Sequence, residues 1–143
     1  MLFPTVAFAR LSRSFFRSPR LGQTFSRCLS GEVSECGITN IQDEADFEKR
    51  VVNNKRPVLV DFHATWCGPC KLLGPRLDEL MKSYMDRMLL AKVDVDKHDS
   101  IAAKYKISAV PTVIAMKNGR EVSRFSGLKE KEFIQKMILS LTN

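Results

Sequence analysis

The chain has 143 residues, 44% of them hydrophobic, which is enough for one domain of ordinary size plus a tail. Its formal net charge of +7 is concentrated at one end, because the segment before Glu32 holds five arginines and no acid, while the remainder holds 18 basic and 16 acidic residues. The remainder has no basic stripe to hold phosphates, which argues against a nucleic-acid-binding protein. No segment approaches the roughly 18 to 20 apolar residues needed to span a bilayer, so we expect no transmembrane segment.

The N-terminal end of the chain is basic and amphipathic. On a helix of 3.6 residues per turn, residues 5–18 place Arg10, Arg13 and Arg17 on one side, with apolar side chains nearly opposite. A segment rich in Arg and Ser and without acids is typical of a mitochondrial transit peptide, whereas a secretory signal places its charge before an unbroken apolar run. A basic membrane-surface segment and a disordered tail are the alternatives. We predict cleavage near Leu29, which divides the chain into a transit peptide over 1–29, a linker over 30–37 and a folded domain over 38–143.

The pattern becomes regular from about residue 37. An apolar piece at 38–41 is followed by Asp43, which can cap a helix that turns Phe47 inward. The nearly continuous apolar run 58–63 predicts a strand buried on both faces. The next helix follows two cysteines and contains Pro75, which predicts a kink. Its expected core-facing residues are Leu73, Leu77, Leu80 and Tyr84.

The sequence pattern in the second half of the domain predicts a strand, a helix, a hairpin and a last helix. The strand covers 88–95 and the short helix 100–105, and Asn118-Gly119 is a strong turn signal between strands at 112–116 and 121–125. The expected buried side of the last helix carries Phe133, Ile134, Met137, Ile138 and Leu141. The order β-α-β-α-β-α-β-β-α predicts an α/β fold, a central mixed β-sheet with helices on both faces. Such sheets place their chemistry at the carboxyl end of a central strand, where the two cysteines lie.

Cys67 and Cys70 are placed for thiol chemistry. Cys67 falls at the first turn of a helix, where unpaired amides and a partial positive charge stabilise a thiolate. Cys70 lies on the same side of the helix and can close a small ring with Cys67 and reopen it. Gly68 adds no obstructing side chain, and Pro69 gives up an amide that has no partner at a helix start. The pattern predicts reversible dithiol–disulfide exchange.

A structural zinc site and a structural disulfide are the alternatives for this pair. Zinc needs three or four protein ligands and the pair supplies two. The other candidates, with no second close pair among them, are His63, His98, Cys36 and Cys28. A disulfide in so small a ring removes little chain entropy, and a reducing compartment does not favour one. We therefore expect no bound metal and a free thiol at Cys36, with regulatory oxidation of that thiol as the alternative.

The segment Val60-Asp61-Phe62-His63-Ala64-Thr65-Trp66-Cys67-Gly68-Pro69-Cys70-Lys71 resembles the active-site segment of the thioredoxin family. The likeness runs from about residue 38 to the end of the chain, through 91–96, 110–112, 117–119 and Gly127. His63 and the stretch 108–119 are similar to the mitochondrial branch of the family in particular. The resemblance implies the thioredoxin fold and agrees with the predicted transit peptide.

The resemblance also implies a protein-disulfide reductase. In that mechanism Cys67 attacks a client disulfide and Cys70 resolves the mixed disulfide, which leaves Cys67–Cys70 as the redox-active disulfide. The domain binds no cofactor, because electrons come from NADPH through a flavoprotein, mitochondrial thioredoxin reductase. Peroxiredoxins and other disulfide-containing proteins are the implied clients, and the mitochondrial matrix is the implied location.

Roles for the neighbouring residues follow from the same resemblance. Asp61 lies in an apolar strand, where its pKa should rise, and would take a proton from Cys70 through water, with Lys92 modulating it. A structural acid is the alternative for Asp61. Client contact is implied for Trp66, Val110, a cis-bonded Pro111 and Gly127, with the backbone before Pro111 pairing with an extended client peptide. Trp66 could instead serve packing alone, and Pro111 could be a simple strand-start proline.

The other polar residues near the pair have plainer interpretations. We expect His63 to be a structural histidine with satisfied hydrogen bonds, and tuning of the site is the alternative. We expect Lys71 and Lys92 to be solvated charges, although either would favour a nearby thiolate.

Two rival functions stay open at this point. A disulfide oxidant or isomerase of the same fold commonly carries His where this chain has Pro69, so Pro69 favours the reductase. A non-catalytic binding module with this fold predicts that Cys67→Ser keeps all function.

Overall fold

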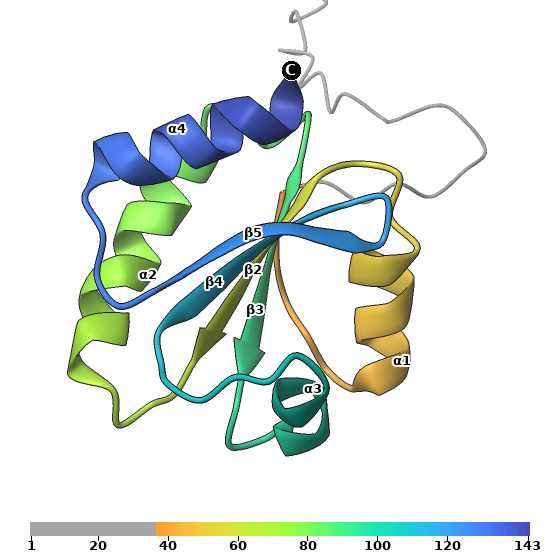
Figure 1. Cartoon of the computed structure of the whole chain (residues 1–143), viewed down its shortest axis with the longest axis vertical. Helices are drawn as coiled ribbons and strands as arrows, with labels where there is room; N and C mark the ends of the chain where they lie inside the picture. The colour runs from red at the N-terminus through yellow and green to blue at the C-terminus, as the bar shows by residue number, and fades with distance from the viewer. Residues whose placement is uncertain (1–36) are drawn as a thin grey trace, which may run out of the picture. The chain divides into compact units, whose positions relative to one another are not determined.

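The computed structural model describes residues 37–143, so the predicted transit peptide, Cys28 and Cys36 lie outside the described residues. The described residues begin with strand β1, and strands alternate with helices up to the hairpin of β4 and β5, which precedes the last helix (Figure 1). The strands are β1 (Gly37–Asn40), β2 (Val58–His63), β3 (Leu89–Asp94), β4 (Thr112–Lys117) and β5 (Arg120–Ser126). The helices are α1 (Glu44–Phe47), which continues as a π-helical turn (Glu48–Val52), α2 (Gly68–Met81), α3 (Asp99–Lys104) and α4 (Lys131–Thr142). This order confirms the predicted β-α-β-α-β-α-β-β-α arrangement.

The strands form one mixed sheet in the order β1-β3-β2-β4-β5. The pairs β1/β3 and β3/β2 are parallel, and the pairs β2/β4 and β4/β5 are antiparallel. Strand β2 therefore occupies the centre of the sheet, and its register sets Asp61 opposite Lys92 on β3 and His63 opposite Asp94. On the other side, Asp61 faces Val113 of β4.

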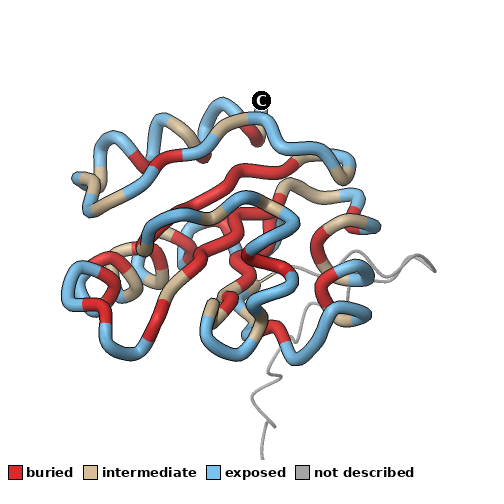
Figure 2. Tube along the Cα trace, turned by 60° about the horizontal axis from the view of Figure 1, so that its bottom comes forward, coloured by how far each residue is buried: buried red, intermediate tan, exposed pale blue. Residues whose placement is uncertain are grey.

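Successive side chains of β2 point to opposite faces of the sheet and so belong to two separate hydrophobic cores. Leu59 packs with apolar residues of α2 and α4 on one face of the sheet. Val58, Val60 and Phe62 pack with residues of α1 and α3 on the other face. Figure 1 shows this division, with α2 and α4 on one side of the sheet and α1 and α3 on the other. Figure 2 shows buried positions along the strands and on the inner side of each helix. Asp61 shares the parity of Leu59, so it is buried on the α2 side of the sheet.

Local signals in the sequence account for the ends of several elements. Asp43 caps α1 by accepting a hydrogen bond from the Asp46 amide at 2.7 Å, as predicted. The hairpin turns at Asn118 and Gly119, both with positive φ, which matches the two-residue turn expected from that dipeptide. The π-helical turn after α1 was not expected from the pattern.

One expected core-facing residue of a helix is exposed, and another faces the core as predicted but lies outside its helix. Phe133 of α4 is 48% exposed, and its ring lies edge-on against Phe125 instead of entering the core. Tyr84 is buried, but it lies beyond the end of α2 in a series of turns. Leu80 and Met137 are only partly buried. Among the described residues, no helix is long and apolar enough to cross a membrane.

Candidate active site

The cysteine pair lies between the carboxyl end of β2 and the first turn of α2. Cys67 is the N-cap of α2, with extended backbone, and Cys70 lies in its first turn. The two form a disulfide with their Cα atoms 5.3 Å apart. Pro69 occupies one of the first two helical positions, where its missing amide leaves no hydrogen bond unmade. The pair is therefore held where an open α/β sheet positions its reactive groups.

The start of α2 is built to stabilise a negative charge on Cys67. The Cys70 amide donates a hydrogen bond to Cys67 Sγ at 3.2 Å, in the way that an N-cap side chain accepts from the first turn. The positive end of the helix dipole adds to that effect and favours a thiolate over a thiol at Cys67. Both cysteines are largely buried, with 4% and 8% of their surface exposed. A reacting partner must therefore come close to the protein surface at this point.

The loop before β4 lies against the cysteines. The Val110–Pro111 peptide bond is cis. Val110 packs, with Val95, on a small cluster formed by Ala64, Cys67 and Cys70. The structure thus brings Val110 and Pro111, which follow Cys70 by 40 and 41 residues along the chain, next to the pair.

Gly127 is joined to this loop at the end of β5. Its amide donates a hydrogen bond to the Pro111 carbonyl oxygen at 2.8 Å, and its φ of +80° is one that favours glycine. Within residues 37–143, the backbone of Val110 makes no hydrogen bond to another backbone group. An amide and a carbonyl beside the cysteines are therefore free to pair with an incoming chain.

Trp66 lies on the surface beside Cys67. Its side chain is 69% exposed, and its indole nitrogen donates a hydrogen bond to Asp96 at 3.0 Å. An aromatic ring so exposed adds little to the core, which argues against a role in packing alone. The bond to Asp96 fixes the ring's orientation next to the pair.

Asp61 is a buried acid on the side of the sheet that faces α2. It is 3% exposed, and within the described chain its Oδ1 atom is buried without a hydrogen-bond partner. Burial raises the pKa of Asp61 from its usual 3.8 to about 6; the charge of Lys92 opposes this rise and the charge of Asp78 adds to it. Asp61 and Cys70 line one open pocket of about 410 Å³. Water in that pocket can reach both side chains.

Lys92 is not the solvated charge expected from the sequence. Its side chain is 19% exposed, and Nζ donates a hydrogen bond to Oδ2 of Asp78 on α2 at 2.8 Å. Nζ also lies 2.7 Å from Asp78 Oδ1, in a direction unfavourable for a second hydrogen bond. Lys71, by contrast, is exposed as expected.

His63 departs from the structural role expected for it. Its ring is partly buried and makes no hydrogen bond within residues 37–143. Burial lowers the pKa of His63, the charge of Asp94 opposes that effect, and Lys92 and Lys97 add to it. His63 lines the pocket that holds Asp61 and Cys70, and also a neighbouring pocket that holds His98. His98 instead makes a hydrogen-bonding contact with the Ile41 carbonyl oxygen at 3.0 Å.

Sequence reasoning missed two residues of the site, Asp78 and Asp96. Asp78 could have been noticed, because Cys70, Gly74 and Asp78 follow each other at steps of four along one stripe of α2. Nothing in the sequence pattern singles out Asp96 as the partner of Trp66. That contact depends on how the loop after β3 approaches the loop before α2.

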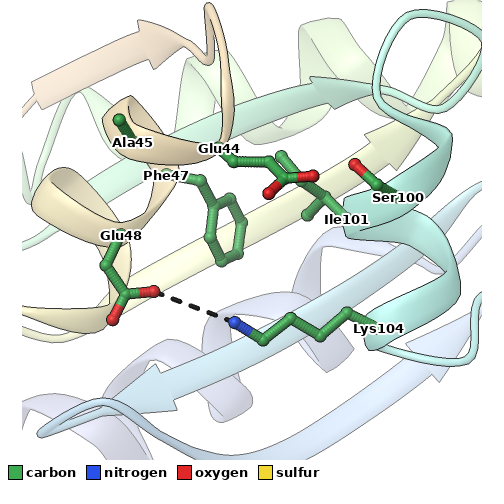
Figure 3. A pocket seen from close by; sticks show the side chains of 7 residues that line it. All are labelled: Glu44, Ala45, Phe47, Glu48, Ser100, Ile101 and Lys104. Atoms are coloured by element: carbon green, nitrogen blue, oxygen red, sulfur yellow. Dashed lines mark ion pairs between the residues drawn. The ribbon is translucent and has the colours of Figure 1, made fainter.

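The described residues contain no group of three potential metal ligands among His, Cys, Asp and Glu side chains. A larger pocket of about 510 Å³ lies between α1 and α3, on the other face of the sheet (Figure 3). It carries the Glu48–Lys104 ion pair at 3.8 Å and no sulfur atom. Within residues 37–143, the two cysteines therefore lie on the α2 side of the sheet and away from this pocket.

Comparisons with known proteins place this chain among thioredoxins, in agreement with the cysteine pair at the start of α2. The thioredoxin family model matches residues 38–140. Mitochondrial thioredoxin of Bos taurus is 52% identical over 108 residues, which cover 72% of this chain and 65% of that protein. A probable thioredoxin-2 of Caenorhabditis elegans is 46% identical over 101 residues, which cover 71% of this chain and 70% of that protein. This chain thus spans just under two thirds of the bovine relative's length.

Solved structures agree in fold. The thioredoxin of Malassezia sympodialis superposes with a TM-score of 0.69 at 31% sequence identity, and the match covers 78% of this chain and 96% of that one. A variant thioredoxin of Halobacterium salinarum gives the same TM-score at 30% identity. The family model covers most of the chain, and the sheet order and the placement of the cysteine pair agree with it, so the chain belongs to the thioredoxin family.

Proposed function

We propose that this protein reduces disulfide bonds in client proteins through the Cys67/Cys70 couple. The observation that carries the proposal is the position of the pair: a disulfide at the N-terminus of α2, with the Cys70 amide directed at Cys67 Sγ. A pair held this way can cycle between dithiol and disulfide without moving the scaffold. Membership of the thioredoxin family supports the same chemistry.

The reaction runs in two exchanges. In the reduced protein the Cys67 thiolate attacks one sulfur of a client disulfide, forms a Cys67–client disulfide and releases the other client sulfur as a thiolate. The Cys70 sulfur, after losing its proton, then attacks Cys67 Sγ. The new Cys67–Cys70 bond forms as the Cys67–client bond breaks, and the second client thiol leaves. Two electrons and two protons pass from the protein to the client.

Asp61 is the group best placed to take the proton from Cys70. The two side chains line one pocket, and a carboxyl whose pKa is about 6 is largely ionised at neutral pH while still being a useful base. A water molecule would link them, because the structure records no direct hydrogen bond between them. Asp61 would thereby speed the second exchange rather than the first.

Clients would bind across the exposed surface around Cys67. The unpaired backbone of Val110 can accept and donate hydrogen bonds to an extended peptide, in the manner of an added strand. Trp66, next to Cys67 in the sequence, offers an exposed aromatic surface, and Gly127 leaves room for a close approach. This surface is open, which suits a protein that reduces many different disulfides.

We also propose that the protein works in mitochondria and is reduced by a thioredoxin reductase that draws on NADPH. The bovine relative is named a mitochondrial thioredoxin, and residues 1–29 have the Arg-rich, acid-free composition of a transit peptide. Removal of 1–29, with 30–37 as a linker, would leave the domain of 38–143. The matrix is the proposed location, and peroxiredoxins and other disulfide-containing proteins are the proposed clients. Thioredoxins need no bound cofactor.

Insulin reduction tests the proposal directly. The protein is mixed with insulin, NADPH and mitochondrial thioredoxin reductase, and NADPH consumption is followed for wild type, Cys67→Ser and Cys70→Ser. We expect activity only in wild type, and a trapped mixed disulfide with Cys70→Ser. Turnover by Cys67→Ser would contradict the thiol mechanism and favour a binding module. Oxidation of reduced substrates faster than reduction of insulin would favour an oxidant or isomerase.

A further inference from the structure

Three charged side chains, Asp61, Lys92 and Asp78, lie in a row from the sheet to α2. Asp61 on β2 lies opposite Lys92 on β3 in the parallel register, and Lys92 reaches across to Asp78 on α2. The order is acid, base, acid. The single base is therefore available to either of two carboxyl groups.

Lys92 forms its ion pair with Asp78 on α2 and not with Asp61 on β2. Its Nζ atom donates to Asp78 Oδ2 at 2.8 Å and lies 2.7 Å from Asp78 Oδ1. No ion pair joins Lys92 to Asp61 within residues 37–143, and Asp61 Oδ1 is left buried without a partner. An unpaired buried oxygen beside an ammonium group is unusual, because a lysine in that register could satisfy it.

We propose that Asp78 is a positioning residue that holds the Lys92 ammonium away from Asp61 and thereby keeps Asp61 able to accept a proton near neutral pH. This inference rests on the proposed role of Asp61 in the second exchange. Asp78 contacts neither cysteine, so it would act only through Lys92 and through its own charge. Its removal would free the ammonium group of Lys92, which lies opposite Asp61 in the register of β2 and β3.

The electrostatics of Asp61 support this arrangement. Burial makes the largest contribution to the raised pKa of Asp61, the positive charge of Lys92 lowers that pKa, and the negative charge of Asp78 raises it. Loss of the Asp78 carboxylate removes a negative charge that raises the pKa of Asp61. It also releases the Lys92 ammonium group, whose positive charge lowers that pKa. Both changes act in the same direction.

Other groups around Asp61 do not replace Asp78. Strand β4 presents the apolar Val113 opposite Asp61. On β2, His63 lies two residues along the same face, and α2 contributes Cys70 and Lys71 to the shared pocket. Asp94 is opposite His63 at the outer end of β3. Asp78 is the acid that holds Lys92 within the described residues.

A purely structural role is a weaker explanation of the ion pair. Asp78 is 40% exposed, and an ion pair with so much solvent around one partner adds little to stability. The neighbouring Glu79 makes a similar contact, 2.6 Å from Lys131 of α4, with both side chains well exposed. Glu79 therefore gives a matched control on the same helix, one residue from Asp78 and paired with α4 instead of β3.

The direct test is the titration of Asp61 in full-length reduced protein, followed by carbon NMR of its carboxyl group between pH 4 and 9. In Asp78→Asn we expect the Asp61 titration to move to lower pH by about one pH unit. Asp78→Glu should restore the wild-type titration, and Glu79→Gln should not change it. An unchanged titration in a folded Asp78→Asn protein would overturn the proposal.

Kinetics and a second background complete the test. The one tryptophan of the chain, Trp66, adjoins Cys67 and can report single-turnover reaction with a small disulfide in a stopped-flow instrument. The second exchange in Asp78→Asn should be roughly threefold slower at pH 8 and approach the wild-type rate below pH 6, because Asp61 is then a weaker base but ionises at lower pH.

In a Lys92→Met background, Asp78→Asn should shift the Asp61 titration less than it does in the wild-type background. An equal shift would mean that Asp78 does not act through Lys92. Because the titration needs no turnover, its outcome is separate from the insulin assay, whose failure would count against the reductase itself.

Discussion

Asp61→Asn should stabilise the protein at neutral pH, because the wild-type carboxylate is ionised in a buried site. The pKa of Asp61 is about 6 in the folded protein and 3.8 is its ordinary value, which we take for the unfolded chain. Folding therefore favours the protonated form. The contribution of that proton to stability is fully present below pH 3.8 and is lost as the pH rises from 3.8 through about 6.

The size of the effect follows from the difference between the two pKa values. One pKa unit corresponds to about 1.4 kcal/mol, so ionised Asp61 lowers the free energy of unfolding by about 3 kcal/mol above pH 7. Asn has nearly the same shape as the protonated acid and no charge. We expect Asp61→Asn to be more stable than wild type by about 3 kcal/mol at pH 7.5, by about half of that at pH 5, and by almost nothing near pH 3.5.

Urea unfolding of the oxidised full-length proteins, followed by circular dichroism at each pH, measures these differences. Asp86→Asn is the control, because Asp86 is exposed and should change stability by less than about 0.5 kcal/mol at every pH. A gain for Asp61→Asn that is the same at pH 5 and pH 7.5 would refute the electrostatic explanation. A gain below about 1 kcal/mol at pH 7.5 would mean that solvent or a partner relieves the charge.

Four other substitutions test the scaffold and the client surface. Gly119→Ala should lower the free energy of unfolding by about 2 kcal/mol, because φ is +72° and the new Cβ would lie 2.7 Å from the Val52 carbonyl oxygen. Gly74→Ala should raise the free energy of unfolding by about 0.5 to 1 kcal/mol in the same urea titration, because Gly74 lies in a helix and its Cβ would meet open space. Asp43→Ala should remove the cap of α1 and lower stability by about 1 kcal/mol, with faster amide exchange in α1 as the local readout. Trp66→Ala should leave stability within about 0.5 kcal/mol and slow the reduction of insulin more than that of a small disulfide, and equal slowing of both would contradict client contact.

The sequence was most informative where a local rule and the tertiary structure agree. The apolar run of β2 predicted its burial on both faces, and the dipeptide at Asn118 predicted the hairpin. The sequence predicted Cys67 at the first turn of a helix that follows a buried strand, and the structure makes Cys67 the N-cap of α2. In each case the signal and its consequence lie within a few residues of one another.

The sequence was least informative where contacts depend on how elements pack. Phe133 comes one residue before the buried stripe of α4, and only the position of β5 decides that its ring rests on Phe125 at the surface. Lys92 was expected to be solvated because the pattern does not show that α2 brings an acid over β3. His63 was expected to have hydrogen-bond partners, and the site leaves it without one in the described chain.

The state of Lys92 separates two explanations of the buried acid. If Asp61 were a structural acid, the simplest arrangement would pair it with the lysine directly opposite, and its pKa would then be low. The structure instead pairs that lysine with Asp78 and leaves Asp61 with a raised pKa, at a cost to stability of about 3 kcal/mol when it is ionised. Such a carboxyl group is a poor stabiliser and a suitable base for a thiol in the same pocket. The pairing that weakens the fold at this point is therefore the one that the proposed role of Asp61 in the second exchange calls for.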